Sequence, residues 1–116
     1  MLDEAEAELR AVSEGRQPSA IELLALGSVD LRRGRTAEAA LRFEQALTVS
    51  PLVAYRVMIG YHYAVVGRHA LAVPNLSRAF EIDRACADFV HWSPPFAAHR
   101  NQPGMADLLG RYRGAR

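Results

Sequence analysis

The feature that most constrains the fold of this chain is an internal repeat with a period of 33 residues. A shift of this length brings Gly27 onto Gly60 and Gly34 onto Gly67. Apolar residues recur in step with the glycines, as the pairs Ala39 and Ala72, Phe43 and Leu76, Ala46 and Ala79, and Leu47 and Phe80. A repeat of this length is typical of a supersecondary unit that buries its apolar face against neighbouring units.

Local signals predict that each copy is a helix, a turn and a second helix. Ser19 and Glu22 have the spacing of a capping box, which starts a helix. Gly34 suits the left-handed position that follows a helix end, so this helix should end near Arg33. We expect Thr36 to cap the next helix. Ser50-Pro51 should close the unit and open the following helix, because proline is tolerated at the first helical position.

With these residues in view, the segment 20–85 resembles two tetratricopeptide repeats, W-x2-L-G-x2-Y…A-x3-F…P. Gly27, Ala39, Phe43, Ala46 and Pro51 carry the resemblance in the first copy. It implies an all-α fold, a tetratricopeptide-like α-α superhelix with one repeat at 20–52 and another at 53–85. The small residues would lie where helices cross, because larger side chains would force the helix axes apart.

Two flanking segments complete the predicted single domain, 1–116. Residues 1–18 are expected to hold an N-terminal helix over 3–14, with one narrow apolar stripe. Residues 86–116 are expected to cap the repeats. They resemble a terminal segment of bacterial tetratricopeptide proteins, PxFxxLRxxPRFxxLLxxxG, through Pro94, Phe96, Arg100, Pro103, Leu108 and Leu109.

That resemblance implies an extended aromatic stretch and a last short helix that lie over the repeat surface. We expect helix to continue from Ala85 to Val90 but not through the segment 91–95, which ends in two prolines. The final helix should begin at Pro103 and face inward with Leu108, Leu109 and Tyr112. Met105 is expected to fill an apolar gap.

Pro74 conflicts with the predicted second helix of the second copy, because proline in a helix interior removes a hydrogen-bond donor and clashes with the preceding turn. The sequence allows a helix that begins late, near Val73, or a helix that is kinked at Pro74. We favour the late start.

Composition and charge exclude several classes of function. The net charge of +1 is too small to hold a nucleic acid by counterion release. No apolar run approaches the length of a membrane span, and the start of the chain lacks the features of a secretory signal. Cys86 is the only cysteine, which excludes an intrachain disulfide and fits a reducing compartment. The protein is therefore expected in the cytoplasm, either alone or as a fragment of a longer polypeptide.

No motif for catalysis or for metal binding occurs. The four histidines lack metal-ligand spacing, and the glycines are dispersed instead of forming a phosphate loop. Ser77 and Cys86 have no motif partner that would activate a nucleophile. We therefore expect neither catalytic nor metal-binding residues, no cofactor and no enzymatic activity.

The tetratricopeptide resemblance also implies a binding surface, since the first helix of each repeat in that family lines a concave groove. The groove residues carried over to this chain are Leu24, Ser28, Leu31, Arg32, Val57, Tyr61 and Val65. Their mainly aliphatic character predicts a protein or peptide partner with an apolar or amphipathic segment. The expected function is that of a bacterial scaffold or adaptor that binds other proteins.

Three alternatives stay open at this point. The helix at 3–14 or the segment 92–112 of the same chain could fill the groove, because two repeats alone cannot easily bury their faces. The groove could instead form a homodimer interface. The chain could also be a regulatory C-terminal piece of a larger bacterial multidomain protein.

Overall fold

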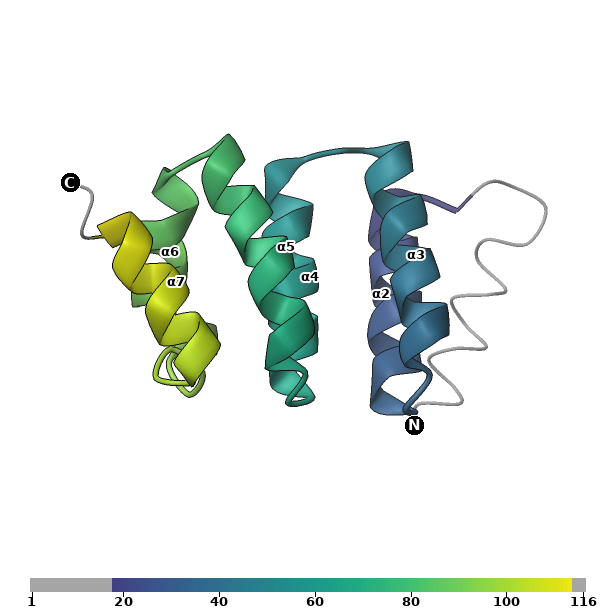
Figure 1. Cartoon of the computed structure of the whole chain (residues 1–116). Helices are drawn as coiled ribbons and strands as arrows, with labels where there is room; N and C mark the ends of the chain where they lie inside the picture. The colour runs from purple at the N-terminus through teal and green to yellow at the C-terminus, as the bar shows by residue number, and fades with distance from the viewer. Residues whose placement is uncertain (1–17, 114–116) are drawn as a thin grey trace. The chain divides into compact units, whose positions relative to one another are not determined.

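The computed structural model describes residues 18–113, which are helical apart from turns and short connections (Figure 1). The chain divides into two compact units between Leu52 and Val53. The helices of the first unit are α2 (Ala20–Arg32) and α3 (Thr36–Val49). Those of the second unit are α4 (Val53–Val65), α5 (His69–Ile82), α6 (Ala85–Trp92), the 3-10 turn η1 (Pro94–Phe96) and α7 (Pro103–Arg113). The all-α prediction is confirmed for these residues, whereas the helix predicted at 3–14 lies outside them.

The 33-residue period of the sequence is also a period of the backbone. A shift of 33 takes both ends of α2 onto the ends of α4, and both ends of α3 onto the ends of α5. The first helix of each pair has 13 residues and the second has 14. Each copy is therefore a helical hairpin, as predicted. That the two units form one domain stays a prediction.

Both hairpins turn through a glycine in the left-handed conformation, with φ of 77° at Gly34 and 79° at Gly67. In the first turn Gly34 N–H donates to Leu31 O and Arg35 N–H donates to Asp30 O, at 3.0 and 2.8 Å. The equivalent amides of Gly67 and Arg68 make the same two bonds in the second turn. These are Schellman motifs, in which glycine avoids the steric cost that a side chain pays at positive φ.

The prediction for the start of α2 is confirmed, whereas those for the starts of α3 and α4 are wrong. Helix α4 begins at Val53 and not at Pro51. The Ser19 hydroxyl accepts from Glu22 N–H at 3.2 Å, and the Glu22 carboxylate accepts from Ser19 N–H at 3.3 Å. Thr36, however, is the first residue of α3 and not its cap. In the Schellman turn the N–H of Arg35 is bonded to the Asp30 carbonyl, and this places Arg35 at the N-cap position of α3. No side chain donates or accepts a capping hydrogen bond at this helix start.

A glycine lies at the helix contact of each hairpin. A Cβ atom added to Gly27 would lie 2.8 Å from Cδ1 of Phe43. One added to Gly60 would lie 2.6 Å from Cγ of Leu76. Because Gly27 and Gly60, and likewise Phe43 and Leu76, are equivalent in the repeat, both hairpins use the same glycine to bring their helices together.

Pro74 lies inside α5, so the late helix start that we favoured is wrong. The helix begins at His69 and continues through Pro74 to Ile82. The carbonyl that Pro74 leaves without a donor belongs to Ala70, and both residues are exposed, so water can solvate that carbonyl. The opposite face of α5 buries Ala72, Leu76, Ala79 and Phe80 completely, which offsets the local cost.

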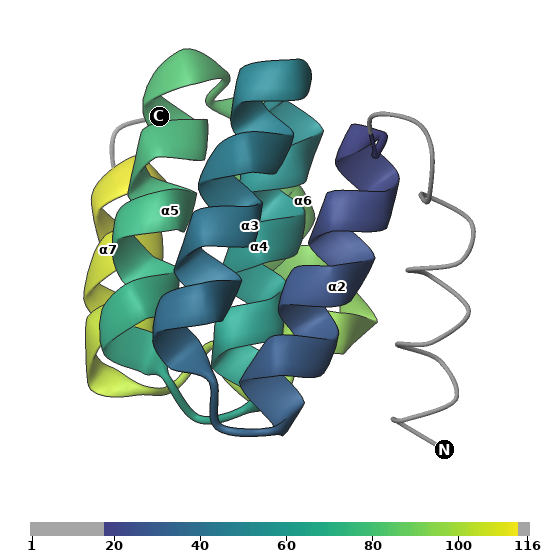
Figure 2. The ribbon, with the colours of Figure 1, turned by 90° about the vertical axis from the view of Figure 1, so that its right-hand side faces the viewer.

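The second unit has a continuous apolar core to which α4, α5, α6, η1 and α7 all contribute. Within it α7 packs against α5, and Figure 2 shows the two helices side by side. Pro103 begins α7, and Met105, Leu108 and Leu109 are buried, as predicted. The Tyr112 ring meets the Phe80 ring edge-on at 5.2 Å between centroids.

The segment between α5 and α7 differs from the prediction. Helix α6 extends through His91 and Trp92, and Ser93 ends it in an extended conformation because Pro94 disfavours the helical conformation of the residue before it. The expected extended stretch is a 3-10 turn, η1. Phe96 in this turn is buried, whereas Trp92, at the end of α6, is 69% exposed.

Helices α6 and α7 follow the same period as the first two hairpins. Their first residues, Ala85 and Pro103, lie within one residue of the positions 33 after the starts of α4 and α5. Met105 and Leu109 correspond to Ala72 and Leu76 of α5, and all four residues are buried. The C-terminal segment is therefore a third helical pair with a shortened first helix.

Candidate functional site

The predicted binding residues of the first unit lie on α2, and two of the four are buried. Leu24 is 1% exposed and Leu31 is 5% exposed. Ser28 is half-buried, whereas Arg32 is exposed near the helix end. Only Ser28 and Arg32 can therefore reach a partner while the unit keeps this packing.

The predicted residues of the second unit lie along α4 and become more exposed toward its C-terminal end. Val57 belongs to the apolar core, Tyr61 is half-buried, and Val65 is 43% exposed. The ring of Phe96 stands edge-on against Tyr61, with 5.4 Å between centroids and 70° between planes. Within this unit the chain's own C-terminal segment covers part of the predicted surface, in agreement with the self-filling alternative. Partner binding by the rest stays a prediction.

A second exposed apolar surface, which the sequence did not indicate, lies on α6. Phe89 is 62% exposed and Trp92 is 69% exposed, while Ala87 and Val90 of the same helix are buried. The spacing of three residues places both aromatic side chains on one face of the helix. We missed this face because Trp92 was expected outside the helix.

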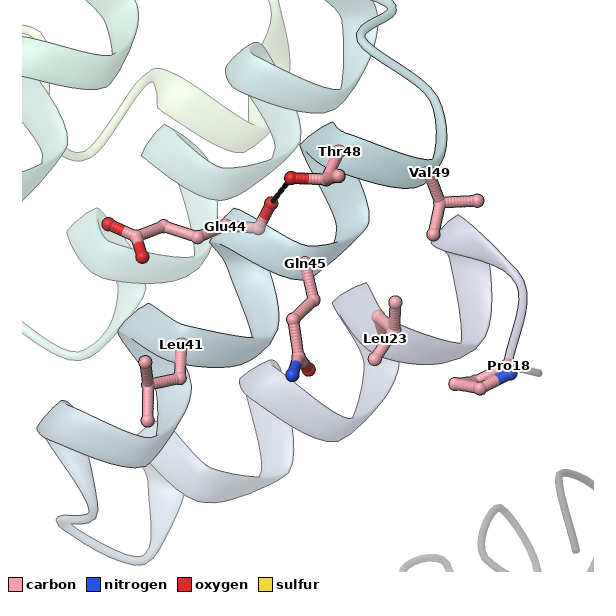
Figure 3. A pocket seen from close by; sticks show the side chains of 7 residues that line it. All are labelled: Pro18, Leu23, Leu41, Glu44, Gln45, Thr48 and Val49. Carbon is pink, nitrogen blue, oxygen red and sulfur yellow. Dashed lines mark hydrogen bonds between the residues drawn. The ribbon is translucent and has the colours of Figure 1, made fainter.

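A hollow of about 480 Å³ lies on the face shared by α2 and α3 of the first unit (Figure 3). Pro18 and Leu23 lie on one side of it, and Leu41, Gln45 and Val49 of α3 lie on the other. The polar lining is neutral apart from Glu44, and the hydroxyl of Thr48 donates to the Glu44 carbonyl at 3.0 Å within α3. This hollow is suited to an apolar side chain.

Leu41, Gln45 and Thr48 form a stripe along α3, and the equivalent stripe of α5 in the second unit is more polar. The positions equivalent to Leu41, Gln45 and Thr48 hold Pro74, Arg78 and Glu81, and Arg78 pairs with Glu81 at 3.2 Å. The α3 stripe is thus the more apolar of the two. The sequence contains this difference, but it emerges only when the two copies are compared position by position.

A buried ion pair joins the two helices of the first hairpin. Asp30 is 2% exposed and accepts from Nε of Arg42 at 2.8 Å. Nη1 of Arg35 lies 3.7 Å from the other carboxylate oxygen. Asp30 replaces the aromatic residue found at the equivalent position of the second copy, Tyr63. Because its charge is neutralised within the hairpin, we assign Asp30 a structural role.

Two histidines that are distant in the sequence meet in the second unit. Nε2 of His69, the first residue of α5, lies 3.2 Å from Nδ1 of His99, which precedes α7. Burial, and then the positive charge of His69, lower the pKa of His99 below its usual value. Nothing in the local sequence around either residue indicates this contact.

Cys86, near the start of α6, is half-buried. Burial, followed by the negative charge of Asp83, raises the pKa of the Cys86 thiol, which keeps the thiol protonated at neutral pH. Among residues 18–113 no three histidine, cysteine or acidic side chains gather closely enough to hold a metal ion. Over the same residues, every helix is too short or too polar to cross a membrane.

A comparison of the chain with family models, curated proteins and solved structures finds no match. The candidate binding surfaces on α2, α4, α6 and the α3 stripe are therefore inferred from their geometry and chemistry alone.

Proposed function

We propose that this chain is a non-enzymatic protein–protein interaction module of the tetratricopeptide type. Three features support the assignment: the 33-residue period of the helix bounds, the two glycine turns of identical hydrogen bonding, and the glycine at each helix contact. The third helical pair supports it further, because about three units are needed to bury the faces of such repeats.

The observation that carries the binding function is the set of large apolar side chains that the first helices of the second and third pairs leave exposed. Met58 and Val65 on α4 are 37% and 43% exposed, and Phe89 and Trp92 on α6 are exposed still further. Exposed aromatic residues of this kind supply most of the binding free energy in many protein interfaces. The partner is therefore a protein with an apolar or amphipathic segment.

Polar residues on the first helices would give the bound segment its direction. Arg32 is exposed and Ser28 is half-buried on α2, and the phenolic group of Tyr61 offers a hydrogen bond on α4. Polar groups at the edge of an interface set orientation more than affinity. The compartment we propose is the bacterial cytoplasm.

The exchange of Val65 for glutamate tests this function against a closely matched control. Val65 and Ile82 are each the last residue of a helix in the second unit, and both are about half exposed, at 43% and 51%. Val65 lies on a first helix, whereas Ile82 lies on a second helix. We expect Val65→Glu to weaken binding of a co-purifying partner at least tenfold, or about 1.4 kcal/mol, because a carboxylate would be desolvated in the interface.

The control variant, Ile82→Glu, should bind the partner as tightly as the wild type, measured by calorimetry with the purified partner. Equal affinities for both variants would exclude the first-helix surface as the binding site. Light scattering of the purified chain measures its molar mass in solution and so distinguishes a homodimer from a monomer that binds another protein. In the homodimer the bound partner is a second copy, and Val65→Glu yields a monomer.

A further inference from the structure

The contact between His69 and His99 links the start of α5 to the connection at 97–102 that precedes α7. Besides the 3.2 Å separation of Nε2 and Nδ1, the two ring centroids lie 5.3 Å apart. Within a neutral pair, one imidazole donates its N–H and the other accepts. The bond thus depends on at least one histidine that lacks a second proton.

The charged groups around this pair do not compensate a positive charge. His69 lies at the positive N-terminal end of the α5 dipole, directly after the exposed Arg68. Beside His99, Arg100 directs Nη1 away from the pair, to the carbonyl of His91 at 2.9 Å. In the described part of the chain, neither imidazole forms an ion pair with a carboxylate.

The other helices of the unit also present charged and titratable side chains. On α7 these include Asp107 and Arg111, which are exposed. On α4 and α6 they include His62 and Asp88, which are half-buried, together with His91. Burial is the larger cause of the lowered pKa of His99, and the positive charge of His69 is the second.

The pair can take up two protons, of which the first leaves the hydrogen bond in place and the second breaks it. After the first proton, an imidazolium can still donate to the neutral imidazole. The second proton removes the acceptor and places two positive charges about 3 Å apart. Above the usual histidine pKa of about 6.5 the hydrogen bond is present. As the pH falls from that value through the lowered pKa of His99, the second proton binds and the hydrogen bond is lost.

The connection that His99 anchors also positions Phe96. The amides of His99 and Arg100 both donate to the Phe96 carbonyl, at 2.9 and 3.1 Å. Phe96 is 2% exposed and its ring covers Tyr61. We propose that the His69–His99 pair is a proton-sensitive clasp that holds this connection on α5, so that acidification loosens the cover over Tyr61.

This inference concerns regulation of the binding surface and in that respect rests on the proposed function, whereas the clasp itself can be measured without any partner. A proton is the ligand that the geometry favours over a metal ion. Only two nitrogens meet here, and no third ligand joins them among residues 18–113.

Hydrogen exchange of the His99 and Arg100 amides tests the clasp in the purified chain. We expect their protection factors, corrected for intrinsic exchange, to fall about fivefold between pH 7.5 and pH 5, which is the effect of losing one hydrogen bond of ordinary strength. The variant His69→Gln keeps a side-chain hydrogen-bonding group but cannot titrate, so its protection factors should stay constant with pH. His99→Asn should behave in the same way, which guards against a folding defect in one variant.

His62→Gln is the matched control, because His62 lies on α4 outside the pair, and it should retain the pH dependence of the wild type. A wild type whose protection factors do not change with pH would overturn the clasp, as would His69→Gln with the full wild-type pH dependence. Because no partner is present, a failure of the proposed binding function leaves this result intact.

Discussion

Replacement of Gly60 by valine should destabilise the second unit by about 3 kcal/mol, at the upper end of the usual cost of overpacking a core. A Cβ atom at this position would lie 2.6 Å from both Cγ and Cδ2 of Leu76, which is completely buried. Leu76 lies in the same core as Phe80 and Met105, and all three are completely buried, which leaves Leu76 little room to turn away. Urea denaturation followed by far-UV circular dichroism measures the loss.

Gly110→Ala provides the control for this prediction. Gly110 also lies within a helix, α7, but a Cβ atom there meets nothing within 4 Å. This variant should gain up to about 1 kcal/mol, because alanine has the higher helix propensity. The account of close helix approach at Gly60 would be contradicted if Gly60→Val were as stable as the wild type.

Removal of the Arg42 side chain should destabilise the first unit by about 3 kcal/mol, because it leaves the buried Asp30 carboxylate without its close partner. The remaining cation, Arg35, lies 3.7 Å away and is 44% exposed. Burial of an incompletely paired charge costs more than the net contribution of an intact pair. Chemical denaturation of Arg42→Ala measures this cost.

The exposed pair of Arg78 and Glu81 supplies the comparison, since both side chains are more than half exposed. Arg78→Ala should cost less than about 1 kcal/mol. In the second copy, Tyr63 and Asn75 occupy the positions equivalent to Asp30 and Arg42. The double variant Asp30→Tyr with Arg42→Asn should therefore be more stable than Arg42→Ala. Equal losses for Arg42→Ala and Arg78→Ala would show that burial of Asp30 does not matter.

The parts of the fold that could be predicted from the sequence are those that depend on neighbouring residues. The Ser19 capping box and the turns at Gly34 and Gly67 are local devices, and the 33-residue period indicated both hairpins. Pro74 was misjudged because the packing of α5 outweighs the local cost of proline. We placed the end of α6 too early, because Pro94 disfavours the helical conformation only at Ser93, directly before it, and the helix continues to Trp92.

The candidate site could be predicted only in part, since the resemblance implies which helix face binds a partner but not what covers that face. Leu24 and Val57 share the predicted face with Arg32 and Val65, yet the first two are buried and the last two are exposed. The cover that Phe96 places over Tyr61 depends on a contact between residues 35 positions apart. The contact of His69 with His99 likewise joins residues 30 positions apart, and neither contact has a local signal.

Site-specific photo-crosslinking in cells tests the central claim, that the first helices carry the binding surface, most directly. A photoreactive phenylalanine analogue would replace Trp92 on α6, Val65 on α4 or, as the control, Ile82 on α5; all three side chains are exposed. The account predicts a crosslink to one and the same partner protein from positions 92 and 65, and none from position 82. A crosslink to that partner from position 82 but not from positions 65 and 92 would contradict it.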